Sequence, residues 1–393
     1  MILYHMLRDS AFLYPSKTAI IYNEKRISYR EFLRSVNKLH QCFTDFDIYK
    51  NMKIGLILHN SDMYCITLYA LSKNESISCL LNPLWNVDKL EKMIRNAGLD
   101  AVIVEEYVLK EIKETRPELI NEFHFISRNE IEAALKSNTK EIPEDETYEI
   151  SENDLLKKEL IQCSSGTTGL GKMGYRTQKN ILCDAKNIIA TFGYNSEDIV
   201  FCPIAMCHGY GLTMGLIAPV MSGTTIIIER LFRCGYFIKH YGTIKPTIFL
   251  GTPDIYGEIC SYLDGKLFSF PFRKWFFCSG DPLFKDTGKK FHDITGVWIN
   301  QVLGMMEVST ICANLNPSEE NYMSVGKPVI DLKLDRYRPG YESSIFVKGD
   351  TVSTEYIVDT KDVPIQLFDG WFHTKDISTM NESGEIFIKG RLA

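Results

Sequence analysis

A run of glycine and hydroxyl residues that ends in a lysine offers the clearest chemistry in this 393-residue sequence. It reads Cys163-Ser-Ser-Gly-Thr-Thr-Gly-Leu-Gly-Lys172. Glycine lets the backbone approach an anion closely, the hydroxyls of Ser165, Thr167 and Thr168 donate to phosphate oxygens, and Lys172 adds a positive charge. The segment predicts a phosphate-binding loop, although a surface turn rich in Gly and Thr would have the same composition.

The same segment also fits most of the Walker pattern GxxxxGK, from Gly166 to Lys172. Met173, however, occupies the position of the magnesium-binding Ser or Thr. The next helical pattern begins only after Thr177, whereas a Walker helix begins at the lysine itself. A P-loop NTPase therefore remains the less favoured alternative.

Six further segments follow the loop in order, and together the seven resemble the motifs of the adenylate-forming superfamily. That group includes acyl-CoA synthetases, firefly luciferase and the adenylation domains of nonribosomal peptide synthetases. Ser165–Lys172 is similar to its phosphate loop, S-G-T-T-G-x-P-K. The other matches are Thr177–Asn180 (T-H-x-N), Pro203–Leu212 (P-L-F-H-x-x-G-L), Ser279–Leu283 (S-G-x-P-L), Gln301–Glu307 (x-x-Y-G-x-T-E), Asp369–Asp376 (D-G-W-F-x-T-G-D) and Gly384–Arg391 (G-x-I-x-I-x-G-R).

The resemblance implies a site for ATP and Mg²⁺. Lys172, Thr168 and Glu307 would serve catalysis, and Glu307 would also help to bind Mg²⁺, for which a carboxylate oxygen is a suitable ligand. Asp376 would accept hydrogen bonds from the ribose hydroxyls, with Arg391 nearby. The other nucleotide-binding positions that the resemblance implies are Ser165, Gly166, Thr167, Gly169, Gly280, Asp281, Pro282, Gln301 and Leu303.

Each of these roles has a simpler alternative. Glu307 alone would be read as a surface carboxylate at a helix start, the segment Gly280–Pro282 as an ordinary turn, and Asp376 as a cap. The resemblance instead implies that Gly280–Pro282 flanks the adenine and that the Gln301 amide meets its amino group.

The acyl pocket is implied around His208, together with Gly209, Ser279 and Gly304. A single histidine in an apolar run is otherwise a core residue with its hydrogen bonds satisfied. Relatives that activate amino acids place an Asp near positions 206–211 to hold the α-ammonium group, and none occurs there. We therefore expect an aryl, fatty or short acyl acid, with coenzyme A or the phosphopantetheine of an acyl or peptidyl carrier protein as the thiol acceptor.

Five positions depart from the family pattern. Gly171 replaces proline, which we expect only to loosen the loop, and Gln178 replaces histidine. Leu303 replaces the aromatic residue that stacks on adenine, and Met306 replaces a threonine whose hydroxyl reaches phosphate. Lys375 replaces the glycine before Asp376. These changes leave open a second hypothesis, a non-catalytic or partly degenerate relative that binds a nucleotide or an acyl-adenylate.

The chain ends at Ala393, two residues after the hinge signature. In the family a small C-terminal domain follows, which carries a lysine for adenylate formation and rotates to build the thioester-forming site. We therefore expect an adenylation core without its C-terminal small domain, and the position of the end favours a truncated chain.

Strands and helices alternate through the first half of the sequence. Thr18–Tyr22, Ile54–Leu58 and Ala101–Val104 are predicted strands, Asp62–Leu71 is a predicted helix, and Ser28-Tyr-Arg-Glu31 has the pattern of a capping box. This order predicts an α/β fold with a largely parallel sheet. Further strands are predicted at Thr224–Ile228, Thr247–Leu250, Ser344–Lys348 and Glu385–Lys389.

We expect a large core of two α/β sheet subdomains plus a smaller, β-barrel-like subdomain. The predicted boundaries are 1–150 for the first α/β subdomain, 151–320 for the second with the phosphate loop, and 321–393 for the β-rich part that ends at the hinge. The acidic stretch 139–154 looks like a surface connection between the first two.

Composition restricts the partners. A net charge of −6 does not indicate the excess of basic residues that is typical of nucleic-acid-binding proteins. Eleven cysteines without CxxC pairs indicate reduced thiols of a cytoplasmic protein. The uncharged stretch 199–228 contains two prolines and four glycines, so buried strands and helices fit it better than a membrane span.

Overall fold

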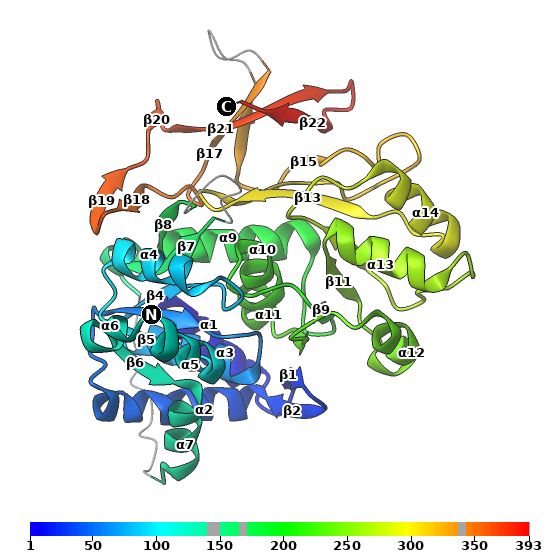
Figure 1. Cartoon of the computed structure of the whole chain (residues 1–393). Helices are drawn as coiled ribbons and strands as arrows, with labels where there is room; N and C mark the ends of the chain where they lie inside the picture. Colours follow the sequence, from blue (N-terminus) through cyan, green and yellow to red (C-terminus); the bar gives the residue numbers. More distant parts are fainter. Residues whose placement is uncertain (140–149, 165–170, 337–342, 393) are drawn as a thin grey trace. The chain divides into compact units, whose positions relative to one another are not determined.

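The computed structural model describes residues 1–139, 150–164, 171–336 and 343–392 (Figure 1). These residues form two compact units. Unit 1 comprises Met1–Leu182, Ala205–His208 and Ser353–Ile365, and unit 2 comprises Cys183–Ile204, Gly209–Val352 and Gln366–Ala393. Each unit is therefore assembled from segments that are distant in the sequence. The predicted division at 150 and 320 stays a prediction.

Unit 1 is built on an 8-stranded sheet in the order β19-β18-β8-β7-β4-β3-β5-β6. The strands from β7 to β6 are parallel, while β8, β18 and β19 pair antiparallel at the other end. The strand bounds are β3 (Lys53–Ile57), β4 (Ile77–Leu80), β5 (Ala101–Val104), β6 (His124–Ser127), β7 (Lys158–Cys163), β8 (Met173–Thr177), β18 (Glu355–Val358) and β19 (Lys361–Pro364). The strands β1 (Thr18–Tyr22) and β2 (Lys25–Ser28) form an antiparallel hairpin.

Helices cover this sheet because the chain must cross over between parallel strands. One large cluster of buried side chains joins the helices α4, α5 and α6 to the sheet, including Leu90 and Ile94 from α4, Ile112 from α5, and Val102 and Val104 from β5. The helices of unit 1 are α1 (Ile2–Leu13), α2 (Tyr29–Cys42), α3 (Asp62–Lys73), α4 (Val87–Ala97), α5 (Glu106–Thr115), α6 (Pro117–Glu122), α7 (Arg128–Ser137) and α8 (Glu152–Leu155), with a 3₁₀ turn at Phe43–Phe46.

Unit 2 contains a second, largely parallel sheet in the order β15-β14-β13-β12-β11-β9-β10. Its strands run parallel from β10 to β13, and β14 and β15 close one edge antiparallel. Its strands are β9 (Ile199–Cys202), β10 (Thr225–Ile228), β11 (Ile248–Gly251), β12 (Trp275–Cys278), β13 (Asn300–Met305), β14 (Ser309–Ala313) and β15 (Lys327–Pro328). Its helices are most of α9 (Gln178–Phe192), α10 (Gly209–Leu212), a π-helix at Thr213–Ile217, α11 (Ala218–Met221), α12 (Cys234–Ile244), α13 (Pro253–Leu263) and α14 (Lys285–Thr295).

A 5-stranded antiparallel sheet completes unit 2, as predicted for a smaller β-rich part near the end of the chain. It is formed by β16 (Lys333–Asp335), β17 (Ser344–Lys348), β20 (Leu367–Phe368), β21 (Trp371–Met380) and β22 (Ile386–Arg391). The predicted α/β fold with two sheets and a β-rich sheet is confirmed. The sequence did not predict that β18 and β19, which lie between β17 and β20 in the chain, belong to unit 1.

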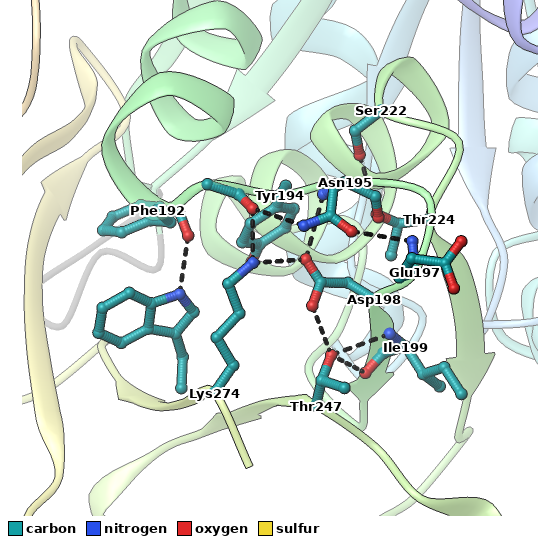
Figure 2. Close-up of polar contacts among 12 residues, drawn as sticks. Phe192, Tyr194, Asn195, Glu197, Asp198, Ile199, Ser222, Thr224, Thr247 and Lys274 are labelled. Carbon is teal, nitrogen blue, oxygen red and sulfur yellow. Dashed lines mark hydrogen bonds and ion pairs between the residues drawn. The ribbon is translucent and has the colours of Figure 1, made fainter. Parts of the chain in front are cut away.

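A buried polar network fixes the start of β9 in unit 2 (Figure 2). Asp198 is 4% exposed, and its carboxylate pairs with Lys274 at 2.7 Å and accepts a hydrogen bond from the Thr247 hydroxyl at 2.9 Å. It also accepts the backbone N–H of Asn195 at 3.1 Å. A buried carboxylate is tolerated when it is paired and hydrogen-bonded, so this network joins the end of α9 to β9 and β11.

The uncharged stretch 199–228 forms β9, α10, the π-helix, α11 and β10, as expected for buried elements broken by turns. In the parts of the chain that the structure describes, no helix combines the length and the apolar character that crossing a membrane requires.

Candidate active site

The two ends of the predicted phosphate loop, just after β7 and just before β8, are hydrogen-bonded to each other in unit 1. The Ser164 N–H donates to the Lys172 carbonyl at 2.9 Å, and the Lys172 N–H donates to the Ser164 hydroxyl at 2.8 Å. Ser165, Gly166, Thr167, Thr168 and Gly169 lie outside the described residues. Lys172 leads into strand β8 rather than into a helix, which contradicts the Walker alternative.

Gly171 has a conformation that other residues rarely adopt. Its φ is +76°, and a Cβ at this position would lie 2.4 Å from the Ser164 carbonyl oxygen. The expectation that glycine here only loosens the loop is therefore wrong, because the closure between Ser164 and Lys172 uses a backbone that needs glycine. Proline, the family residue, has φ fixed near −65° and could not take this conformation.

The Lys172 side chain contacts a residue that the motifs did not identify. Its ammonium lies 3.3 Å from the Tyr356 hydroxyl and 5.0 Å from the centre of the Tyr356 ring. The two residues are 184 positions apart in the chain. A contact between residues so far apart in the chain leaves no local sequence pattern, so the sequence gave no indication of Tyr356.

His208, the predicted acyl-pocket residue, belongs to unit 1. Its Nε2 lies 3.4 Å from the side-chain nitrogen of Asn82, which follows β4. Burial, and then the positive charge of Lys89, hold the pKa of His208 below its ordinary range. His208 is therefore neutral near pH 7, which suits a residue that contacts an acyl group by shape and hydrogen bonding rather than by charge.

The remaining predicted residues belong to unit 2, and four of them lie on or beside the β13–β14 hairpin. Gln301 is buried and donates its side-chain N–H to the Tyr322 carbonyl at 2.8 Å, which leaves its carbonyl oxygen as the atom that would accept from an adenine amino group. Leu303 is half-buried, and Gly304 is exposed where the β13–β14 register shifts. Glu307 is buried in the turn that follows β13, so it is neither on the surface nor at a helix start.

A second network supports this hairpin. The Ser309 hydroxyl donates to the Asp184 carboxylate at 2.6 Å and lies 3.5 Å from the Thr213 hydroxyl. Asp184 comes from α9, and the Thr213 hydroxyl donates to the Gly209 carbonyl at 2.8 Å. The predicted substrate residue Gly209 is thus linked to the end of the turn that carries Glu307 through two buried side chains, Thr213 and Ser309. The motif comparison missed Asp184 and Ser309, whose separation of 125 positions leaves no local signal.

The turn Ser279–Pro282 follows β12, at the carboxyl end of a parallel strand. Ser279 is buried and donates its N–H to the Gly251 carbonyl at 3.3 Å, while Gly280, Asp281 and Pro282 are exposed. Gly280 has a φ of +100°, which favours glycine. Ligands of open α/β sheets bind outside the carboxyl ends of the strands, which suits a turn predicted to flank adenine.

Asp376 and Arg391 face each other in the register of β21 and β22, as the prediction of a nearby arginine requires. The Arg391 Nε lies 3.7 Å from the Asp376 carboxylate, and the Asp376 N–H donates to the Thr374 hydroxyl. Burial raises the pKa of Asp376 and the charge of Glu307 adds to the rise, while Arg391 and Thr374 oppose it.

A comparison with protein families matches residues 7–357 to the family described as AMP-binding enzyme. The chain belongs to this AMP-binding enzyme family. The matched range contains every predicted site residue except Asp376 and Arg391.

Curated relatives of this AMP-binding enzyme span nearly its whole length. The long-chain-fatty-acid–CoA ligase of Bacillus subtilis is 24% identical, over 98% of this chain and 76% of the relative. The 2-succinylbenzoate–CoA ligase of Bacillus cereus is 23% identical, over 98% of this chain and 77% of the relative.

Solved structures share the fold. The inhibitor-bound N-terminal domain of FACL13 from Mycobacterium tuberculosis superposes with a TM-score of 0.85 at 20% identity, covering 99% of both chains. A long-chain-fatty-acid–CoA ligase from Archaeoglobus fulgidus has a TM-score of 0.87 at 18% identity, covering 99% of this chain and 84% of the other. The resemblance to adenylate-forming enzymes, the fold and the class of AMP-forming acid–thiol ligase are confirmed, while the role of each site residue stays a prediction.

The donor set of this AMP-binding enzyme fits a magnesium ion that is held mainly by nucleotide phosphates. Mg²⁺ binds through one or two carboxylates plus phosphate oxygens and water, so the single carboxylate of Glu307 is sufficient. Among the described residues, no group of three or more His, Cys, Asp or Glu side chains has the arrangement of a metal cage. The residues present therefore suit Mg²⁺ that arrives with ATP.

Proposed function

We propose that this chain uses ATP to activate a carboxylic acid without an α-amino group, as an acyl-adenylate destined for the thiol of coenzyme A. The observation that carries the proposal is the family match over 7–357, which includes the phosphate-loop lysine Lys172 and the carboxylate Glu307. The two curated relatives above are CoA ligases of acids that carry no α-amino group, which supports this substrate class.

The chemical problem is the approach of two anions, the carboxylate of the acid and the α-phosphate of ATP. Lys172 and the backbone N–H groups near it would reduce the repulsion by holding the phosphates. Glu307 would hold Mg²⁺, which supplies charge stabilisation for the departing pyrophosphate. Asp376 would fix the ribose, and the Gln301 carbonyl oxygen would accept from the adenine amino group. Each residue thus positions one part of the nucleotide.

The acid would lie beside the consecutive residues His208 and Gly209. The segment 206–211 has no carboxylate for an α-ammonium group, and neutral His208 offers neither a positive nor a negative charge. An aryl or aliphatic acid therefore suits this segment better than an amino acid. Coenzyme A is the acceptor that the relatives favour, and a carrier-protein phosphopantetheine is the alternative.

The test is acid-dependent exchange of labelled pyrophosphate into ATP, measured on a panel of aryl, short-chain, long-chain and α-amino acids. Calorimetric binding of the matching acyl-sulfamoyl-adenosines identifies the acid class independently of turnover. We expect exchange and tight binding for one class without an α-amino group, and loss of exchange in Lys172→Ala. Exchange that occurs only with amino acids would contradict the substrate class.

A second candidate function is binding of a nucleotide or acyl-adenylate without turnover. Met306 motivates it, because its thioether cannot donate to phosphate where the family has a threonine, and Leu303 gives adenine an aliphatic contact instead of a stacked ring. Tight binding of an acyl-sulfamoyl-adenosine with no pyrophosphate exchange, persisting when a C-terminal domain of a relative is supplied, would favour this function over the first.

A further inference from the structure

We infer that Tyr356 is a positioning residue for Lys172, holding its ammonium group ready for the terminal phosphates of ATP; this inference rests on the proposed function. One contact carries it. The Lys172 ammonium donates to the Tyr356 hydroxyl at 3.3 Å, and the centre of the same ring is 5.0 Å away. These distances place the ammonium at the hydroxyl end of the ring, and a hydrogen bond there restricts both the reach and the direction of the lysine.

The strand pairing explains why Tyr356 lies there. Strand β18 pairs antiparallel with β8, and Tyr356 is directly opposite Gly174. Side chains two positions apart along a strand share a face, so Lys172, just before β8, is on the same face as position 174. Gly174 adds no side chain on that face. The tyrosine opposite it is thus the neighbouring large side chain that reaches Lys172.

The chemistry of tyrosine suits this task. An exposed lysine samples many rotamers, so a contact that restricts them in advance reduces the side-chain entropy that is lost when phosphate binds. A phenol is uncharged, so it orients the ammonium without neutralising it, as a carboxylate would. The ammonium has three donor protons, and the phenol oxygen accepts one of them.

The hairpin that carries Tyr356 is itself fixed to unit 1. Lys158, at the start of β7, forms ion pairs of 2.6 Å with both Glu355 and Asp362, one from each strand of the β18–β19 hairpin. Its ammonium also lies 3.9 Å from the centre of the Tyr175 ring on β8. A residue can hold another side chain in place only when its own position is fixed. Lys158 fixes the β18–β19 hairpin, and with it Tyr356.

A purely structural role for Tyr356 is the competing explanation, and ligand selectivity separates the two. AMP lacks the β- and γ-phosphates that Lys172 is proposed to hold, whereas ATP carries them. If Tyr356 positions Lys172, its loss weakens ATP and spares AMP. If it only supports the fold of the hairpin, its loss affects the two nucleotides equally or affects neither.

The experiment measures the affinities of the 393-residue chain for Mg-ATP and for AMP by calorimetry. Tyr356→Leu removes the hydroxyl together with the ring and is expected to weaken ATP binding about three- to tenfold, with AMP affinity unchanged. Tyr356→Phe removes the hydroxyl alone and is expected to reproduce most of this loss for ATP. In a Lys172→Ala background, Tyr356→Leu should have no further effect on ATP.

A matched control is Tyr236→Leu, because Tyr236 on α12 also has a cation beside its ring, the guanidinium of Arg233 at 4.5 Å, outside the predicted site. It should leave both affinities unchanged. Equal weakening of ATP and AMP in Tyr356→Leu, or additive losses with Lys172→Ala, would overturn the positioning role while pyrophosphate exchange by the unmodified chain still stood. Absence of ATP binding by the unmodified chain would overturn the proposed function itself.

Discussion

At the scale of single residues, two departures from the family pattern occur where the backbone is left-handed, and they have opposite consequences for backbone strain. Gly171 stands where the family has proline and adopts a φ of +76°. Lys375 stands where the family has glycine and adopts a φ of +67°. The left-handed region costs a residue with a Cβ about 1–2 kcal/mol, so the first departure relieves strain and the second introduces it.

Restoring the family proline at position 171 is expected to impair the loop. Gly171→Pro cannot reach a positive φ, and its Cβ would meet the Ser164 carbonyl oxygen. We expect a loss of about 1–3 kcal/mol in the free energy of unfolding and weaker ATP binding, measured by denaturant titration and calorimetry. Gly265→Ala, at a positive φ with open space around the Cβ, is the control for backbone strain alone. A Gly171→Pro chain as stable as the original would contradict the closed loop ends.

Restoring the family glycine at position 375 is expected to have the reverse effect. Glycine within a strand normally destabilises, but Lys375→Gly removes a left-handed lysine and should raise the free energy of unfolding by about 1 kcal/mol. Lys389→Gly, on the neighbouring strand β22 and not among the residues with positive φ, should lower it instead. Thermal unfolding of both variants measures the difference, and a loss of stability in both would show that the strain is not relieved.

Asp376 should give adenosine binding a distinct pH dependence. Because burial raises its pKa, the carboxyl takes up a proton at a higher pH than an ordinary aspartate. In the proposed role the charged form would accept from both ribose hydroxyls, so we expect affinity for AMP above the raised pKa and a fall in affinity as the pH drops through it. Asp376→Asn should weaken AMP binding at pH near 7 and flatten this profile. The unfolding free energy at that pH should not fall, since a raised pKa means that the folded chain disfavours the charge. A profile unchanged in Asp376→Asn would exclude the ribose role.

At the scale of elements, local sequence patterns predicted the caps, strands and helix starts that depend on residues close together in the chain. The capping box at Ser28 and Glu31 forms as predicted, β1 and β5 have the predicted bounds, and α9 begins directly after Thr177. Strand partners depend on residues far along the chain, so the pairing of β18 with β8 had no local signal. For the same reason the motifs predicted a set of site residues but gave no sign of their contacts Tyr356, Asp184 and Asn82.

The hydrogen-bond and ion-pair network around Asp198 holds the start of strand β9 in place (Figure 2). Asp198→Asn keeps one acceptor but loses the charge that pairs with Lys274, whose side chain is 30% exposed. We expect the free energy of unfolding to fall by about 1–3 kcal/mol. Because solvent around Lys274 weakens the ion pair, we expect a value in the lower part of this range. Glu197→Gln makes the same charge change at the exposed neighbouring position and should alter stability little. Equal effects of the two changes in urea titrations would show that the pairing contributes nothing specific.

At the scale of the whole molecule, neither compact unit is continuous in the sequence. The chain leaves unit 1 after Leu182, returns for Ala205–His208, and returns again for Ser353–Ile365 before it ends in unit 2. Composition and alternation predicted an α/β core and a β-rich part, since these follow from local order. They could not predict that residues from the β-rich part complete the sheet of unit 1, because that depends on where a distant edge strand is left unpaired.

This return of the chain predicts how a fragment would behave. Residues 1–182 alone would leave β8 as a bare edge strand and Lys158 without Glu355 and Asp362. An unpaired edge promotes association, so we expect the fragment to aggregate and to unfold at a lower urea concentration than the same fragment linked flexibly to residues 353–365. Lys158→Ala in the linked form should remove part of the gain, because the two ion pairs join the hairpin to β7. Sedimentation and urea titration measure both effects. Equal behaviour of the two fragments would mean that the first 182 residues need no strand from the end of the chain, and that β18 and β19 are an accessory to the sheet rather than part of its fold.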